Sequence, residues 1–392
     1  MSTKTRIRIP RAPFFDAVRK SNLVQPDDLI AAIMKYDITE ELARDSLRMA
    51  TFFVQKKMLT KYQALQILQG RTQGFILGPY TILDGLRQDR VGIVFRSEDT
   101  RSGLQVAVKV LPTERTNDPT ILAAFRTEMK RAAQIDHANV ARILDYGIHQ
   151  GTHYVVTEYV AGQTFDKVLL KQTLDPNEVA RQIARVAVVL RHAHKHDLFH
   201  RDIKPANIAL TEDGRVKLLD LGLTHMLENP WQQVTRRIKT EEYAEEIDHV
   251  APEQAWGCDM DARGDIYSLG STFYVLLTKR SAFPGDAAEK MKARQLRGVP
   301  APSELNPAVP PELDRIVMKM GANHPHERYQ SIDELLHDLH PWLPITEWLP
   351  LQIQLPNPVL ADRSGQHEAL KKSTGLFGAF KKLFGKSSST PA

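Results

Sequence analysis

The run His-Arg-Asp-Ile-Lys-Pro-Ala-Asn at residues 200–207 places a carboxylate, a cation and an amide close together in the chain. Asp202 can accept a hydrogen bond from an attacking hydroxyl, and Lys204 can face a migrating phosphoryl group. Asn207 can hold a metal ion through its amide oxygen. A phosphoryl transfer requires these polar groups on one short loop, so the rest of the chain must supply partners for a nucleotide.

Further polar residues follow in a consistent order. Lys109 ends a short apolar run with high β propensity. Glu128 lies in a segment, residues 121–129, whose apolar residues have helical spacing. Asp220 opens an Asp-Leu-Gly triplet after a turn signal that predicts a short hairpin. Each of these features is weak alone, but their order along the chain is specific.

Together with Ala-Pro-Glu at 251–253, the run at 265–270 and the late Arg328, these residues make the chain resemble the bacterial eukaryotic-like (Hanks-type) serine/threonine protein kinases. The resemblance implies an α+β, two-lobed protein kinase fold with a five-stranded antiparallel small lobe and a mostly helical large lobe. It implies an ATP-dependent transferase that uses Mg²⁺ and phosphorylates Ser or Thr hydroxyls of a protein substrate in signalling. It also implies a structural ion pair between Glu253 and Arg328.

The resemblance assigns roles to individual residues. Asp202, Lys204 and Asn207 are the implied catalytic residues. Lys109, held by Glu128, would orient the phosphates. The implied ATP-binding residues are Leu86, Gly92, Val94, Ala107, Lys109, Glu128, Glu158, Val160 and Asp220, and the implied ligands of Mg²⁺ are Asn207 and Asp220.

The glycine-rich loop that covers the nucleotide phosphates in the family is altered. Arg87 and Asp89 occupy its first two glycine positions, whereas Gly92 remains at the third and is followed by Val94. The arginine could add a phosphate contact, but Asp89 would repel phosphate unless it turns outward. We expect weaker or slower use of ATP rather than its loss.

The segment before 251–253 also departs from the family. Glu246 stands where a Thr is usual, so a carboxylate would lie beside the catalytic residues. Arg201 is of the kind that usually binds a phosphate on the activation segment, and Thr235 and Thr240 are the candidate phosphorylation sites. The carboxylates in 241–246 could replace that phosphate or be simply solvated.

These departures leave an alternative function open. A pseudokinase, acting as a nucleotide-sensing scaffold, would tolerate the missing glycines and the altered segment before 251–253. The complete catalytic set favours an active enzyme, because degenerate scaffolds usually lose at least one of those residues.

Composition narrows the other function classes. The chain has 392 residues and a net charge of +5, but its 52 basic and 47 acidic residues are interspersed, which argues against a nucleic-acid footprint. Its single cysteine, Cys258, permits no internal disulfide and suits a reducing compartment. No apolar run is long enough for a membrane span, and the N-terminus has no apolar signal region, so we expect a cytoplasmic protein.

The pattern divides the chain into three parts. Residues 1–75 form an N-terminal helical module, residues 80–344 the kinase domain, and residues 345–392 a Pro-rich linker with a mostly disordered tail. In the module, residues 23–33 resemble residues 58–68, and about four short helices are expected. The role expected for it is regulation or partner binding.

One tail segment, residues 375–386, has an apolar helical stripe flanked by Lys381, Lys382 and Lys386. Such a basic amphipathic helix could lie peripherally on an anionic membrane surface or dock in a partner's groove. The alternative is a disordered tail whose aromatic side chains pack onto the domain.

Overall fold

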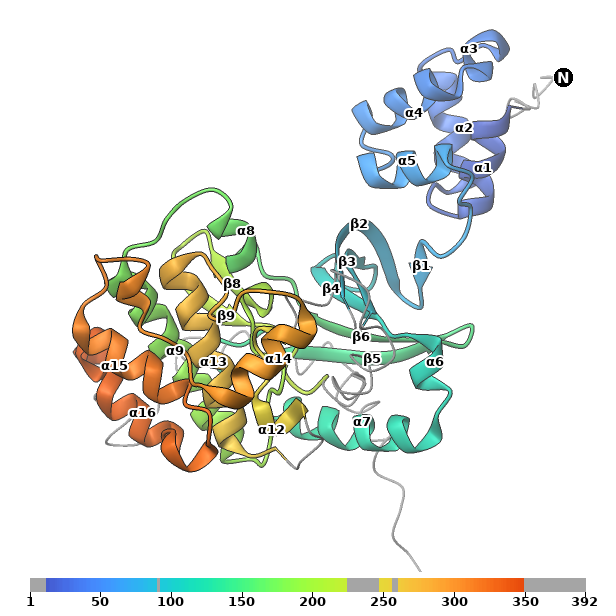
Figure 1. Cartoon of the computed structure of the whole chain (residues 1–392). Coiled ribbons are helices and arrows are strands. Elements are labelled where there is room, and N and C mark those ends of the chain that lie inside the picture. The colour runs from blue at the N-terminus through green and yellow to red at the C-terminus, as the bar shows by residue number, and fades with distance from the viewer. Residues whose placement is uncertain (1–11, 90–91, 224–246, 256–259, 349–392) are drawn as a thin grey trace, which may run out of the picture. The chain divides into compact units, whose positions relative to one another are not determined.

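The computed structural model describes residues 12–89, 92–223, 247–255 and 260–348 (Figure 1). Thr235, Thr240, Glu246, Cys258 and the segment 375–386 lie outside these ranges, so the expectations about them stay predictions. The chain forms two compact units. The first contains the residues up to 118 together with 146–159, and the second contains 119–145 and the chain from 160 onward.

The N-terminal module of the first unit consists of five short helices in its described part, rather than about four. They are α1 (Pro13–Ser21), α2 (Pro26–Lys35), α3 (Glu40–Arg44), α4 (Ser46–Gln55) and α5 (Lys61–Leu68). The two similar segments of the sequence both lead into a helix, α2 and α5. Phe53 of α4 packs edge-on against Phe14 and Phe15 of α1, at ring-centroid distances of 5.6 and 5.7 Å. These buried rings form the core of the module.

The sheet of the first unit has six strands, one more than the predicted five. The additional strand is the two-residue β1 (Ile76–Leu77), which pairs antiparallel with β2. The others are β2 (Tyr80–Asp89), β3 (Gly92–Asp99), β4 (Gln105–Val110), β5 (Ile143–His149) and β6 (Thr152–Glu158). The strand order is β1-β2-β3-β4-β6-β5, and the short helix α6 (Thr113–Thr116) follows β4.

Helix α5 of the module is fastened to strand β2. Thr60 and Gln63 form the capping box that their spacing predicts. The same side chains reach the sheet: Thr60 Oγ1 donates to the Leu83 carbonyl and Gln63 Nε2 to the Ile82 carbonyl, both at 2.6 Å. The ring of Tyr62 packs against the sheet's buried cluster. Module and sheet are therefore joined by buried polar contacts as well as by apolar packing.

The second unit is mainly helical. Its strands are β7 (Gly162–Thr164), β8 (Ile208–Thr211) and β9 (Val216–Leu218), which form a small antiparallel sheet. Its helices are α7 (Pro119–Ala132), α8 (Phe165–Leu169), α9 (Pro176–His194), α12 (Pro252–Ala255), α13 (Ala262–Thr278), α14 (Ala287–Leu296), α15 (Pro311–Met320) and α16 (Ile332–Leu339). The 3-10 turns are η1 (Pro205–Asn207), η4 (Pro302–Glu304), η5 (Pro325–Glu327) and η6 (His340–Trp342).

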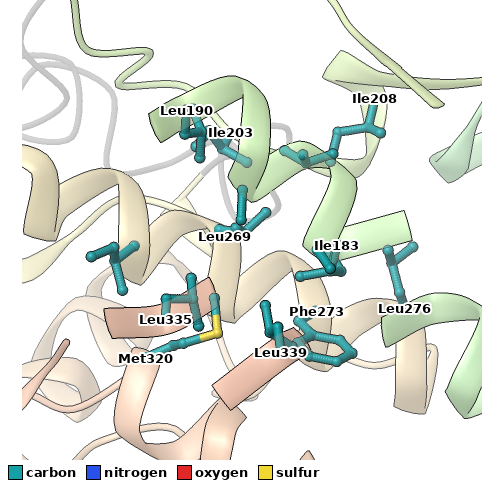
Figure 2. Close-up of a cluster of buried hydrophobic side chains, with 14 of the residues drawn as sticks. Ile183, Leu190, Ile203, Ile208, Leu269, Phe273, Leu276, Met320, Leu335 and Leu339 are labelled. Atoms are coloured by element: carbon teal, nitrogen blue, oxygen red, sulfur yellow. The ribbon is translucent and has the colours of Figure 1, made fainter. Parts of the chain in front are cut away.

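Apolar faces of these helices meet in one core (Figure 2). Phe273 of α13 is fully buried among side chains of α9, α15 and α16. Ile203, from the middle of the 200–207 loop, and Ile208, at the start of β8, belong to the same cluster. The core thus anchors the middle of the 200–207 loop and the strand that follows it. Within the described residues, no helix is both long and apolar enough to cross a membrane.

Replacing Gln63 by Ala tests how the module is attached. The variant leaves the Ile82 carbonyl and the Thr60 N–H without their side-chain partner, so we expect a loss of about 1–3 kcal/mol in the free energy of unfolding of the first unit. Denaturant titration measures the loss. Gln66→Ala on the same helix, whose amide bonds at the surface with Gln69, is the control and should cost less than about 0.5 kcal/mol. Equal stability of the two variants would contradict the attachment.

Candidate active site

The 200–207 loop holds its polar side chains in one connected group. Lys204 Nζ lies 3.0 Å from Asp202 Oδ2, and Asn207 Nδ2 donates to the same oxygen at 2.9 Å. Asn207 Nδ2 also donates to the backbone carbonyl of Asp202 at 2.8 Å. The structure therefore brings together the three catalytic residues predicted from the sequence.

A buried carboxylate of helix α13 fixes the backbone of this loop. Asp265 is fully buried and accepts the N–H groups of His200, at 2.8 Å, and Arg201, at 2.7 Å. His194 Nε2 lies 2.8 Å from Asp265 Oδ2, the oxygen that also accepts the His200 N–H. Burial alone would raise the pKa of Asp265, but the hydrogen bonds from His194 and from the backbone lower it below the ordinary value. Asp265 stays ionised and holds the loop.

Asn207 and Asp220 fit the donor set that Mg²⁺ requires. Because the Asn207 amide nitrogen donates to Asp202, the amide oxygen is turned away from that carboxylate. The Leu219 N–H donates to the Asn207 carbonyl at 2.8 Å, which places the next residue, Asp220, beside Asn207. An amide oxygen and a carboxylate are the hard oxygen ligands suited to Mg²⁺.

Close packing constrains the last two residues of the Asp-Leu-Gly triplet, Leu221 and Gly222. Gly222 has a positive φ of 85°, and a Cβ there would lie 2.5 Å from the Cβ of Ala132 at the end of α7. Leu221, which replaces the more usual Phe, is buried in the core of the second unit. Only glycine fits this approach without a shift of the helix.

Three of the predicted nucleotide residues, Val94, Ala107 and Lys109, lie on one face of the sheet in the first unit. In the β3–β4 ladder Val94 pairs with Lys109, and Ala107 lies two residues earlier on β4, so all three side chains share a face. The alternate residues, such as Phe95 and Val108, belong to the buried cluster that Tyr62 packs against. Module and predicted nucleotide residues thus use opposite faces of the sheet. Leu86 lies at the irregularity of β2, and Glu158 ends β6.

Asp89 does not turn away from Lys109, the lysine that is predicted to bind phosphate. Its Oδ2 lies 2.9 Å from Lys109 Nζ and 3.4 Å from Arg87 Nε. Its Oδ1 accepts the Gly92 N–H at 3.1 Å. The sequence left open whether Asp89 turns outward; the structure shows that it does not, because the buried ammonium of Lys109 attracts the carboxylate.

Glu128 of α7 also has a partner that the sequence did not indicate. In the second unit its Oε1 lies 3.7 Å from Arg201 Nη1. The expected phosphate on the activation segment falls outside the described residues. Lys109 and Glu128 belong to different units, so their predicted pairing stays a prediction, and Val160 stays a predicted nucleotide contact.

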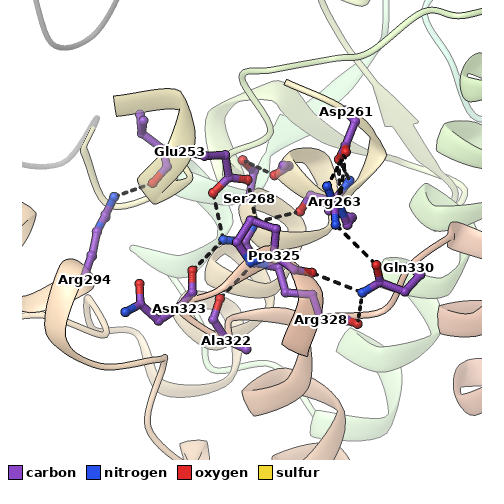
Figure 3. A network of polar contacts seen from close by, with 12 residues as sticks. Glu253, Asp261, Arg263, Ser268, Arg294, Ala322, Asn323, Pro325, Arg328 and Gln330 are labelled. Carbon is purple, nitrogen blue, oxygen red and sulfur yellow. Dashed lines mark hydrogen bonds and ion pairs between the residues drawn. The ribbon is translucent and has the colours of Figure 1, made fainter. Parts of the chain in front are cut away.

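The predicted ion pair between Glu253 and Arg328 is confirmed (Figure 3). Arg328 is fully buried in side chain, and its guanidinium donates to both carboxylate oxygens of Glu253, at 2.6 and 2.8 Å. It also donates to the carbonyls of Ala322, Asn323 and Arg263. This bidentate pair ties α12 to the segment before α16.

Nothing in the sequence indicated a role for His249, which is buried in the segment before residues 251–253. Its Nδ1 lies 3.3 Å from Thr272 Oγ1, and that hydroxyl also lies 3.3 Å from the Ile203 carbonyl. Burial, reinforced by the charges of Arg294 and Lys204, lowers the pKa of His249 to about 3. No local signal distinguishes this histidine, because its neighbours come from distant parts of the chain.

The fold and the arrangement of these side chains resemble those of known proteins. The protein kinase domain model matches residues 80–343. A probable serine/threonine-protein kinase from Streptomyces coelicolor is 35% identical over 271 residues, which cover 67% of this chain and 39% of that protein. The serine/threonine-protein kinase PrkC of Bacillus subtilis is 31% identical, covering 67% of this chain and 40% of that protein.

Solved structures agree with this likeness. A crystal structure of the Mycobacterium tuberculosis PknI kinase domain superposes with a TM-score of 0.54 and 25% identity. It covers 69% of this chain and 98% of that one. The chain belongs to the protein kinase family, and its kinase domain is similar to those of bacterial serine/threonine-protein kinases. The predicted fold class and family are confirmed. The chain spans about two fifths of the length of the curated relatives it matches.

His249 gives a prediction about pH. In the unfolded chain its pKa is near 6.5, so between pH 6.5 and about 3 the unfolded state binds a proton that the folded state excludes. Stability supplied by neutral His249 is present above pH 6.5 and is lost as the pH falls, by up to about 1.4 kcal/mol per pH unit.

Denaturant unfolding of the wild type and of His249→Gln at several pH values between 7 and 4 tests this. As the pH falls, the free energy of unfolding of the variant should decrease less steeply than that of the wild type. The difference in slope should correspond to at most one bound proton, about 1.4 kcal/mol per pH unit. His324→Gln, at a surface turn, is the control and should keep the wild-type slope. If the free energy of unfolding depended on pH in the same way for the wild type and His249→Gln, the prediction that His249 is buried and neutral would be wrong.

Proposed function

We propose that this chain is an active protein kinase that transfers the γ-phosphoryl group of ATP to Ser or Thr hydroxyls of a protein substrate. The observation that carries the proposal is the linked group of Asp202, Lys204 and Asn207 on a loop held by Asp265. Phosphoryl transfer depends mainly on positioning and on electrostatic stabilisation, and such a group provides both.

Each residue has a distinct task in this proposal. Asp202 accepts the hydrogen bond of the substrate hydroxyl and orients it toward the phosphoryl group. Lys204, 3.0 Å from Asp202, supplies positive charge to the moving group. Lys109 binds the α- and β-phosphates on the face that it shares with Val94 and Ala107. Serine or threonine is the expected acceptor, because the lysine stands two residues after the aspartate.

Asn207 and Asp220 are the proposed ligands of Mg²⁺. The ion, when bound, would neutralise negative charge on the phosphates. The protein's part is to hold the two ligands next to each other, through the Leu219–Asn207 backbone hydrogen bond, and to fix the amide of Asn207 through Asp202.

The pseudokinase alternative is favoured by one observation, the pairing of Asp89 with Lys109, which makes nucleotide binding harder. Against it, the aspartate, lysine and asparagine of the catalytic loop have the mutual contacts that catalysis needs. Glu246, in the altered segment, lies outside the described residues and does not distinguish an active kinase from a pseudokinase.

Regulation and location belong to the same proposal. The signalling role rests on the N-terminal module, whose helix α5 is attached to the strand that leads into the altered glycine loop. Thr235 and Thr240 are the proposed phosphorylation sites. We place the protein in the cytoplasm, where ATP is available, with its basic segment 375–386 as a peripheral membrane or partner contact.

The activity is tested by the intact mass of the purified protein after incubation with Mg²⁺-ATP. The parent should gain one or more phosphates, and Asp202→Asn should slow the gain by about 10²- to 10⁴-fold, because the hydroxyl loses the carboxylate that accepts its proton. Asp213→Asn, on the exposed β8–β9 turn, is the control and should match the parent.

Peptide mapping of the phosphorylated parent then tests Thr235 and Thr240. Because autophosphorylation is not obligatory in a kinase, a mixture of generic basic proteins serves as a second acceptor. If neither acceptor gains phosphate with the parent, while ATP still binds, the scaffold alternative holds and the proposed activity is wrong.

The tail is tested separately by co-sedimentation with vesicles that contain phosphatidylserine. The full chain should pellet more than a chain that ends at Asp362, and vesicles of phosphatidylcholine alone should capture neither, because the lysines require an anionic surface. Equal pelleting of the two chains would remove the membrane contact from the proposal.

A further inference from the structure

The altered glycine loop places a carboxylate on the lysine that the family uses for phosphate. Asp89 stands at the second glycine position, and its Oδ2 is 2.9 Å from Lys109 Nζ. The Lys109 side chain is only 3% exposed and that of Asp89 16% exposed. The pair is therefore largely removed from water, where the attraction between opposite charges is least screened.

The hairpin itself holds this carboxylate in place. Asp89 ends β2 and pairs with Gly92 at the start of β3, and Asp89 Oδ1 accepts the Gly92 N–H at 3.1 Å. A Cβ on Gly92 would lie 1.9 Å from the carbonyl oxygen of Val110, the residue after Lys109. The end of the hairpin thus packs directly on the part of β4 that carries the lysine, and the ion pair is part of that packing.

A nucleotide phosphate and the Asp89 carboxylate compete for the ammonium group of Lys109. Both are anions that use the ammonium as a hydrogen-bond donor and counter-charge. Holding both near one ammonium would bring two negative charges together, which like-charge repulsion opposes. Like-charge repulsion therefore weakens phosphate binding to Lys109 for as long as Asp89 holds the ammonium.

The neighbouring arginine gives the displaced carboxylate an alternative partner. Arg87 Nε already lies 3.4 Å from Asp89 Oδ2, and its side chain is 18% exposed. Arg87 and Val94 pair across the β2–β3 ladder, as do Val94 and Lys109 across the β3–β4 ladder, so the two cations flank Val94 on one face. A small shift of Asp89 toward Arg87 would release Lys109 without leaving the carboxylate uncompensated.

We propose that Asp89 is a built-in competitor of the nucleotide phosphates: it occupies Lys109 until a phosphate displaces it, and so sets the ATP concentration that the protein requires. The inference rests on the proposed function, in which Lys109 binds phosphate. Asp89 in this view is a determinant of nucleotide affinity that acts through Lys109.

Nucleotide affinity measured by calorimetry tests the inference without relying on phosphotransfer. The probes are ATP and ADP, each with and without Mg²⁺, and adenosine, which has no phosphate. Asp89→Asn keeps the side-chain oxygen for the Gly92 N–H but removes the charge, so ATP and ADP should bind about tenfold more tightly. Adenosine should bind with unchanged affinity.

Asp84→Asn is the matched control, because Asp84 lies on the same strand and is paired with another arginine, Arg96, at 3.7 Å. It should leave all affinities unchanged. The inference is overturned if Asp89→Asn does not tighten ATP and ADP, or if it tightens adenosine by the same factor. A weaker affinity for Mg²⁺-ATP would also overturn it, since it would make Asp89 a metal ligand.

A Lys109→Gln variant separates this inference from the proposed function. If Lys109→Gln leaves the ATP affinity unchanged, the proposed phosphate role of Lys109 is wrong. If it weakens ATP while Asp89→Asn has no effect, the phosphate role holds and the competition does not. With Lys109→Gln in place, adding Asp89→Asn should tighten ATP much less than it does alone, because the ammonium for which they compete is gone.

Discussion

One buried carboxylate fixes the backbone on which the catalytic side chains stand. Asp265, on a helix whose other side chains build the core, accepts hydrogen bonds from two consecutive N–H groups of the catalytic loop. A buried charge is tolerated only when it is hydrogen-bonded, and here the loop provides those bonds. The loop cannot move without leaving that charge unsatisfied. This is why the positions of Asp202 and Asn207 follow from the packing of α13.

Three basic residues predicted for the site each lie close to a carboxylate of their own unit. Lys204 contacts Asp202, Arg201 lies near Glu128, and Lys109 contacts Asp89. In the proposed function, the first pairing orients the acceptor for the substrate hydroxyl. The pairing with Asp89 has a different consequence, because that carboxylate stands where glycine would leave Lys109 to the phosphates. In our proposal, this one change of residue type alters nucleotide affinity while the catalytic group is kept.

The helical module adds a second constraint on the same strand. Thr60 and Gln63 bond to the carbonyls of β2 a few residues before Asp89, and Tyr62 packs on the face of the sheet opposite Lys109. The side chains that cap α5 thus also hold β2. A partner that rearranged α5 would act on the strand that leads into the altered glycine loop, which gives a physical route from the module to the nucleotide residues.

Local signals account for what the sequence by itself determined about this protein: the kinase family, the order of its polar residues, the capping box of α5 and the ion pair of Glu253 with Arg328. Proline, capping residues and the periodicity of apolar side chains act over a few positions, so they can be read without a structure. Spacing along the chain also predicted Asp202, Lys204 and Asn207 as catalytic residues, and the structure brings their side chains into contact.

Only the tertiary structure decided which charges meet. The additional strand β1 is too short to leave a periodic pattern, and five helices rather than four form the module because short turns divide it. Asp89 reaches Lys109 across strand β3, Glu128 of α7 approaches Arg201 of the 200–207 loop, and His249 is made neutral by burial among residues far away in sequence. Such contacts depend on strand register and helix packing, and no local pattern encodes them, because the attraction between two charges depends on their distance in space and on their exposure to water.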